Sequence, residues 1–276
     1  MDKLVSPEPS IAQKFDRVRE AGFDGMAIDL GALTLSEAEA TVPHFVRTGL
    51  LGGLTAFPGS VENLRPALDL GHRISAPYVV VIGQEMPVRV AEMIPLIEGW
   101  LRVAEQEHMP IQFETHRNCI TNDLFTTVQL LEAVPEMRLA ADLSHYVVDR
   151  EMPCPPPASL QALITKVLER SDSFQGRVAA RGQIQIPLSF PQSAKWVGLF
   201  RHWWREGFMA WQARHRTDEA ALVFLCELGP PDYAITDADG CELSDRWEEA
   251  LTLSRWAREL WRDACLAPTH SPAHGT

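Results

Sequence analysis

Short apolar runs alternate with longer amphipathic segments along most of the chain, and this alternation limits the possible folds more than any other feature. The apolar runs predict strands over residues 25–30, 50–57, 78–83, 111–115, 139–143 and 222–228, and one more within 176–186. The segments between them predict helices over residues 11–21, 36–48, 61–75, 86–107, 123–134, 159–170, 196–214 and 243–266. Strands that are separated by helices of this length run parallel, which indicates the α/β class.

Seven such strands come close to a closed (β/α)8 barrel, and 276 residues suit that fold. The missing member would be the first strand, for which only Lys3-Leu4-Val5 is available before Ile11. We therefore expect a TIM barrel whose first strand is short or truncated, as a single domain over residues 1–268 with a disordered tail over 269–276. A doubly wound open sheet is the alternative, but no glycine-rich phosphate loop follows any expected strand.

Composition excludes several classes of function. The net charge of −12 argues against a nucleic-acid partner, because such proteins usually present a clustered basic face. No run of about 18 apolar residues predicts a membrane span. The five cysteines form no CxxC pair, and their odd number argues against a disulfide framework. These observations predict a reduced, cytoplasmic setting.

Acidic side chains stand where three of the expected strands end. Glu114 follows the run 110–113, Asp142 follows 138–141 with His145 three residues later, and Glu227 follows 221–226. In a barrel of this kind, the carboxyl ends of the strands line the active face. Buried carboxylates are costly without a counter-charge, so three that converge need a common partner, and a divalent cation is the simplest one.

Two further side chains are placed by strand periodicity. His116 shares the face of Glu114, where it either contacts substrate or orients the carboxylate. Arg177 lies two residues beyond Gln175 and faces the same side. Its guanidinium either binds a substrate oxygen or anion, or neutralises Glu227.

Four segments resemble those of the xylose-isomerase-like TIM barrels. They read Phe113-Glu114-Thr115-His116-Arg117, Ala141-Asp142-Leu143-Ser144-His145, the expected strand from Gln175 to Ile186, and Cys226-Glu227-Leu228-Gly229-Pro230. The superfamily includes sugar and sugar-phosphate isomerases and epimerases, inosose dehydratases and endonuclease-IV-type nucleases. The resemblance covers roughly residues 11 to 266, and the chain is similar to ketose 3-epimerase-like members and to α-subunits of C-glycoside deglycosidases.

The resemblance implies a metal site and its ligands. Relatives of the ketose 3-epimerases hold Mn²⁺, Mg²⁺ or Co²⁺ between two glutamates, an aspartate and a histidine, so three ligands here would be Glu114, Asp142 and Glu227. Gln175 stands where the histidine is expected, and either it or Gln185 would complete the set. An amide oxygen is a weaker donor than imidazole but suits a hard cation, which favours Mn²⁺.

The implied function is that of a divalent-metal-dependent sugar isomerase or epimerase, which abstracts a proton next to a carbonyl. Glu114 and Glu227 would move the proton, and the residues expected at the substrate are His116, His145, Arg177 and Gln185. The nuclease branch does not fit, since it needs a trinuclear zinc site with many histidines and a basic groove.

Two alternatives stay open. One is a lyase subunit of the C-glycoside deglycosidase type, which eliminates the aglycone from a 3-keto-glycoside beside a small β-sandwich partner. The other is a non-catalytic degenerate barrel that serves as a scaffold, a reading that Gln175 and the thin first strand favour.

Partners are predicted only in outline. We expect a carbohydrate or glycoside substrate, neither nucleic acid nor membrane, and a homo-oligomer. Four tryptophans fall on one expected helix, Trp196, Trp203, Trp204 and Trp211, and indicate barrel packing or a subunit interface. Because Trp203 and Trp204 are adjacent, we expect one of them at the rim or at a partner.

Overall fold

The computed structural model describes residues 9–215 and 220–266. The expected first strand at Lys3-Leu4-Val5 and the expected tail over 269–276 therefore lie outside the described residues. The chain divides into two compact units, which are described separately. The first comprises the residues up to 122 with 129–138, and the second comprises 123–128 with the residues from 139 onward. A single domain over 1–268 stays a prediction.

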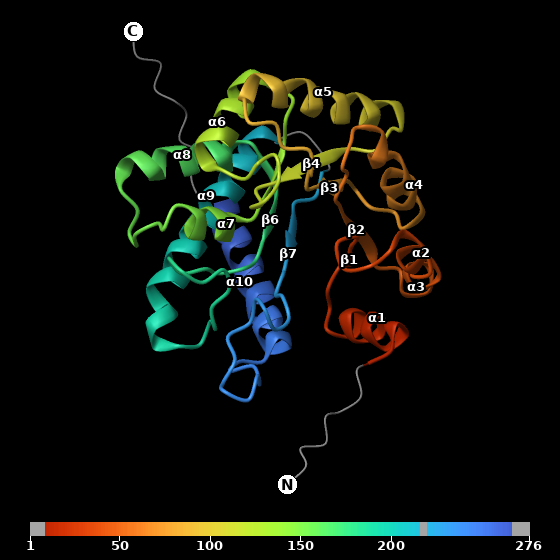
Figure 1. The fold of residues 1–276 in the computed structure, drawn as a ribbon. Coiled ribbons are helices and arrows are strands. Elements are labelled where there is room, and N and C mark those ends of the chain that lie inside the picture. Colours follow the sequence, from red (N-terminus) through yellow and green to blue (C-terminus); the bar gives the residue numbers. More distant parts are fainter. Residues whose placement is uncertain (1–8, 216–219, 267–276) are drawn as a thin grey trace. The chain divides into compact units, whose positions relative to one another are not determined.

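The first unit contains four strands, each parallel to the next in chain order (Figure 1). They are β1 (Gly25–Asp29), β2 (Leu51–Ala56), β3 (Val79–Val81) and β4 (Ile111–Glu114). Its helices are α1 (Ile11–Glu20), α2 (Leu35–Glu39), α3 (Val42–Thr48), the 3-10 turn η1 (Glu62–Leu64), α4 (Arg65–Arg73) and α5 (Val90–Gln106). The helix expected over 36–48 is two helices, and the second has a proline in its first turn.

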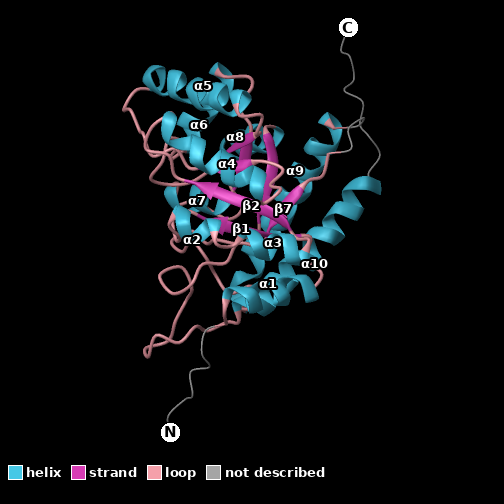
Figure 2. Cartoon of the chain, turned by 90° about the vertical axis from the view of Figure 1, so that its right-hand side faces the viewer, coloured by secondary structure: helices cyan, strands magenta, loops and turns pink. Residues whose placement is uncertain are grey.

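The second unit contains three strands, again parallel in chain order. They are β5 (Leu139–Ala141), β6 (Ser171–Gln175) and β7 (Val223–Leu225). Its helices are α7 (Leu143–Asp149), α8 (Ala158–Glu169), the 3-10 turn η2 (Pro191–Ser193), α9 (Ala194–Arg214) and α10 (Arg246–Leu266), while α6 (Leu124–Ala133) has residues in both units. Figure 2 shows these helices in cyan and the strands in magenta. In this unit, α9 packs beside α8 and α10.

The prediction of a strand within 176–186 is wrong. The strand is β6, which lies directly before that segment, and residues 176–186 form a loop with one isolated bridge between Ala180 and Gln183. The sequence of β6, SDSFQ, has a single large apolar side chain, Phe174. Its strand signal is therefore weak, whereas the loop contains Ile184 and Ile186, which are buried without belonging to a strand.

The strand expected over 139–143 ends two residues early, at Ala141. The chain turns at once into the unpredicted helix α7, because the Asp142 side chain accepts a hydrogen bond from the Ser144 N–H and caps it. This cap fixes the acid at the carboxyl end of β5.

The adjacent tryptophans of α9 are both fully buried, so the expectation that one faces the rim or a partner is wrong. Trp203 donates from its indole N–H to the Gln161 side chain on α8, at 2.9 Å. The Trp204 ring lies perpendicular to the Phe224 ring of β7, with centroids 5.1 Å apart. α9 is thus covered on two sides, by α8 and by β7. The expectation of a homo-oligomer stays a prediction. Across the described ranges, no helix is both long and apolar enough to cross a membrane.

The packing of β6 against α9 fixes which way its side chains point. The Phe174 ring contacts the Phe208 ring of α9, with centroids 5.3 Å apart. Neighbouring residues of a strand point to opposite faces, so Gln175 points away from α9. Gln175 pairs with Leu225 of β7, so the strand ends present one common face opposite the helices.

Two glycines of α9 allow a matched test of this packing. A Cβ added at Gly207 would lie 2.3 Å from the Phe174 ring, whereas one added at Gly198 meets nothing within 4 Å. We expect Gly207→Ala to lower the free energy of unfolding by about 1–3 kcal/mol, although alanine favours helix. Gly198→Ala should raise it by about 0.5–1 kcal/mol. Urea denaturation of both variants measures the difference, and equal effects would contradict the close contact between α9 and β6.

Candidate functional site

The site in the second unit is built around Asp142. It follows the last residue of β5 and is fully buried. Its Oδ1 accepts the Ser144 N–H at 2.9 Å, which orients the carboxylate at the first turn of α7. A carboxylate in this position needs a positive partner, because burial without one is costly.

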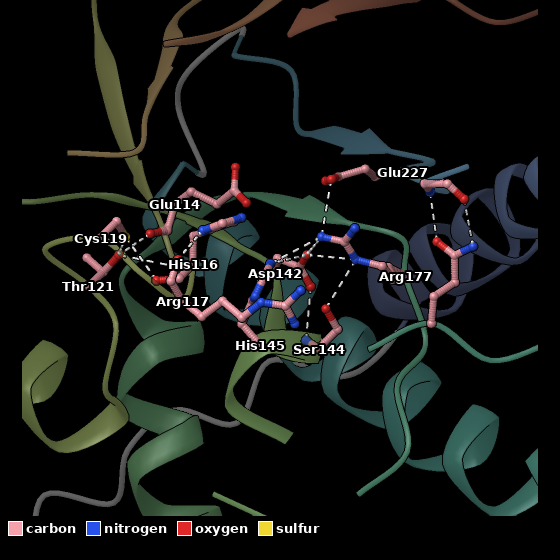
Figure 3. A network of polar contacts seen from close by, with 12 residues as sticks. Glu114, His116, Arg117, Cys119, Thr121, Asp142, Ser144, His145, Arg177 and Glu227 are labelled. Carbon is pink, nitrogen blue, oxygen red and sulfur yellow. Dashed lines mark hydrogen bonds and ion pairs between the residues drawn. The ribbon is translucent and has the colours of Figure 1, made fainter. Parts of the chain in front are cut away.

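Arg177 is that partner. It lies two residues past the end of β6, on the same face as Gln175, and is 2% exposed. Its Nε donates to Asp142 Oδ2 at 3.1 Å and to Ser144 Oγ at 3.2 Å, and its Nη2 donates to the same Asp142 oxygen (Figure 3). The two-nitrogen contact gives the pair a fixed geometry.

The same guanidinium reaches a second acid and a histidine. Nη2 of Arg177 lies 3.2 Å from Glu227 Oε1 and 3.2 Å from His145 Nε2, and that imidazole nitrogen lies 3.4 Å from Asp142 Oδ2. Figure 3 shows Arg177 between Asp142 and Glu227. Of the two roles that the sequence left open, neutralisation of Glu227 is the one that these contacts support. Substrate binding by Arg177 stays a prediction.

Opposing effects act on the pKa of Asp142. Burial raises it, but the charge of Arg177, the imidazole of His145 and the hydrogen bond from Ser144 outweigh burial. The pKa of this carboxyl is therefore held well below its ordinary value, and Asp142 is ionised at neutral pH. Glu227 differs in access, since a third of its side chain is exposed while Asp142 is closed to solvent.

The two glutamines that the sequence proposed as ligands have different environments. Gln175 is 2% exposed, and its Oε1 has no hydrogen-bond partner among the described residues. Gln185 is also buried, but its amide bonds the backbone of Gly229 with both of its polar groups. Buried polar atoms usually have a hydrogen-bond partner or a ligand, and Gln175 Oε1 has no hydrogen-bond partner among the described residues. Gln175 therefore suits the role of a metal ligand better than Gln185 does.

The first unit positions Glu114 and His116. Glu114 ends β4 and is 2% exposed. Phe113 packs towards Trp100 of α5, so the Glu114 side chain points to the opposite face of the strand. Its backbone carbonyl accepts the Thr121 hydroxyl, which ties the following loop to the strand end.

That loop also holds His116 and Cys119. The His116 ring is half-buried, and its Nδ1 contacts the Arg117 carbonyl. Cys119 Sγ lies 2.9 Å from the His116 carbonyl, and burial raises the pKa of the Cys119 thiol to about 11. The thiol is therefore protonated at neutral pH and serves as a packing group.

Sequence reasoning missed two residues of the site. Ser144 donates its N–H to Asp142, and its hydroxyl accepts a hydrogen bond from Arg177. Aspartate is a preferred helix N-cap residue, which was a signal for the first bond, whereas nothing in the sequence signals the second. Tyr233 places its ring over the Arg177 guanidinium, 5.3 Å from the centroid. It lies in a long loop, and no sequence pattern pointed to it.

The arrangement in the second unit can bind a hard cation and move a proton. Asp142, Gln175 and Glu227 offer oxygen donors at the ends of three neighbouring strands, and oxygen donors favour Mg²⁺ and Mn²⁺. Glu227 is the acid of this set that solvent reaches, so it is the one that can exchange a proton with a bound molecule.

Comparison with known proteins shows the fold. No family model matches the chain, and no curated protein matches it either. Among solved structures, a xylose isomerase-like TIM barrel protein from Mycobacterium smegmatis in complex with magnesium has a TM-score of 0.58 at 15% identity, covering 93% of this chain and 90% of that one.

Two sugar epimerases are also similar. A D-psicose 3-epimerase in the presence of D-fructose has a TM-score of 0.56 at 13% identity, covering 92% of this chain and 94% of that one. An L-ribulose 3-epimerase has a TM-score of 0.53 at 16% identity, covering 95% and 96%. The chain therefore has an α/β TIM-barrel fold, as the sequence predicted.

Proposed function

We propose that this protein is a divalent-metal-dependent sugar isomerase or epimerase that abstracts a proton next to a carbonyl. The observation that carries the proposal is the set of oxygen donors at adjacent strand ends, with the Gln175 Oε1 buried and without a hydrogen-bond partner among the described residues. The solved structures of the same fold lend support, since two are sugar 3-epimerases and one is a complex with magnesium.

The proposed metal ligands in the second unit are Asp142, Gln175 and Glu227, and the part of Glu114 of the first unit stays a prediction from the sequence. Carboxylate and amide oxygens are the donors that Mn²⁺ and Mg²⁺ prefer. A bound Mn²⁺ or Mg²⁺ would polarise the sugar carbonyl and acidify the neighbouring C–H. The donor set thus fits the cation.

The proton transfer is assigned to two acids. Glu227 takes the proton from the carbon beside the carbonyl, and a second acid returns one to the opposite face of that carbon, which inverts its configuration. The sequence-based prediction gives this second role to Glu114. Arg177 holds Asp142 and Glu227 in place, while His145 binds a substrate hydroxyl. Substrate contact by His116 stays a prediction from the sequence.

Metal binding gives a direct test. After treatment with a chelator, the protein should bind one Mn²⁺ per chain in a calorimetric titration. We expect Gln175→Leu to weaken binding by about tenfold or more, because it removes one donor. Gln183→Leu, the same change at an exposed position of the next loop, should leave the affinity unchanged. A wild-type protein without a stoichiometric site would reject the enzyme and support the scaffold alternative.

The substrate is sought by the chemistry that an epimerase and an isomerase share. We propose to incubate the protein in D₂O with a panel that starts from D-fructose, D-psicose and L-ribulose, and to follow deuterium incorporation next to the carbonyl by NMR. The deglycosidase alternative predicts release of an aglycone from a 3-keto-glycoside and no exchange into a ketose.

A further inference from the structure

Gln185 makes a two-point contact with the backbone of one residue, Gly229. The Gly229 N–H donates to Gln185 Oε1 at 2.7 Å, and Gln185 Nε2 donates to the Gly229 carbonyl at 3.1 Å. Gln185 is 3% exposed, in the loop that follows β6, 44 residues before its partner. A buried side-chain amide that both donates to and accepts from the backbone of one residue fixes the position and the orientation of that backbone.

The backbone that it holds belongs to the turn that follows Glu227. Gly229 stands two residues after this acid, and the turn folds back so that the Tyr233 N–H donates to the Pro230 carbonyl at 2.9 Å. A Cβ on Gly229 would lie 2.7 Å from the Tyr233 Cβ, so the approach leaves no room for a side chain. The Tyr233 ring in turn covers Arg177.

Glu227 needs such an anchor because it lies outside the strand. β7 ends at Leu225, so its pairing with β6 stops two residues before the acid. Beyond the strand, the Gln185 amide contacts Gly229 and the Arg177 guanidinium contacts Glu227. Loss of the Gln185 contact would remove a restraint on the backbone that carries Glu227, whose Oε1 lies 3.2 Å from Arg177 Nη2.

We propose that Gln185 is a positioning residue, which sets the place of the Glu227 carboxylate by fixing the Gly229 backbone. The inference deepens the proposed function and rests on it, since it assigns to Gln185 a task that matters only if Glu227 binds metal and moves protons. It replaces the sequence-based expectation that Gln185 contacts substrate.

Hydrogen–deuterium exchange of the segment 226–233 tests the contact itself. We expect Gln185→Met, which keeps the volume and removes both bonds, to speed exchange there about tenfold. Gln185→Glu keeps an acceptor for the Gly229 N–H and should give an intermediate rate. Gln183→Met, at an exposed position of the same loop, should match the wild type. A role in packing alone gives the opposite order, with the methionine variant near wild type and the glutamate variant fastest, and would overturn the proposal.

Mn²⁺ affinity then tests the consequence for Glu227. We expect Gln185→Met to weaken Mn²⁺ binding by about fivefold, with Gln185→Glu restoring part of the loss and Gln183→Met causing none. Faster exchange with unchanged Mn²⁺ affinity would overturn the positioning role. If the wild-type chain binds no Mn²⁺, the proposed function fails, whereas the exchange rates still decide whether Gln185 holds the Gly229 backbone.

Discussion

Glu227→Gln should lower the rate of deuterium incorporation next to the sugar carbonyl by about 10³-fold. The amide has the size of the carboxylate and still offers Arg177 an acceptor, but it cannot take up a proton from carbon. The fold should persist, because a third of the Glu227 side chain is exposed and the buried pair of Asp142 and Arg177 does not depend on it. NMR of the sugar in D₂O measures the rate, and circular dichroism checks the fold.

The matched control for this variant is Glu248→Gln, the same chemical change at an exposed position in the first turn of α10. It should leave the exchange rate within twofold of the wild type. If Glu227→Gln also retains a rate within about threefold, this carboxylate is not the base. The proton transfer would then have to be assigned to another acid, with Glu114 the first to replace.

The sequence predicted the parts of this site that follow strong apolar runs. β4, β5 and β7 have such runs, and the structure places Glu114 at the end of β4 and Asp142 directly after β5, as expected. Glu227 comes two residues after β7, which is shorter than the strand expected over 222–228. β6 was misplaced because its inward side chains, Ser173 and Gln175, are polar and only the outward Phe174 signals a strand. A functional site needs polar side chains on the inward face of a strand. Such a strand lacks the apolar pattern by which strands are recognised in a sequence, so β6 was hard to detect.

The contacts of Arg177 and Gln185 were beyond prediction for another reason. Spacing placed Arg177 on the right face, but whether its charge serves substrate or protein depends on distances to side chains of other elements, here α7 and the loop after β7. The partner of Gln185 is a backbone peptide 44 residues away, and a backbone group has no signature in the sequence. Local pattern fixes the direction of a side chain, whereas tertiary packing decides its partner.

Arg177→Met should lower the free energy of unfolding by about 3–5 kcal/mol at pH 7, because it leaves the fully buried Asp142 carboxylate without its main counter-charge. Arg181→Met, at an exposed position of the same loop, should change it by less than about 0.5 kcal/mol. Adding Asp142→Asn to Arg177→Met should recover part of the lost free energy of unfolding, because it removes the buried charge that Arg177 neutralises, so the effects of the two substitutions do not add. Urea denaturation of chelator-treated protein measures the free energy of unfolding of the wild type, the two single variants and the double variant.

The pH dependence of this loss separates charge from packing. In the wild type, burial raises the pKa of Asp142 by less than Arg177 and His145 lower it. The pKa of Asp142 in the folded protein therefore lies below its unfolded value of about 3.9. Its stabilisation is therefore fully present above that pH and is lost as the pH falls through the folded pKa. Without Arg177, burial acts against the weaker effects that remain and the pKa rises, so the variant's deficit should be largest at pH 7 and smaller at pH 4. A deficit of equal size at both pH values would mean that Arg177 stabilises the fold through packing and hydrogen bonds, not through its charge on Asp142.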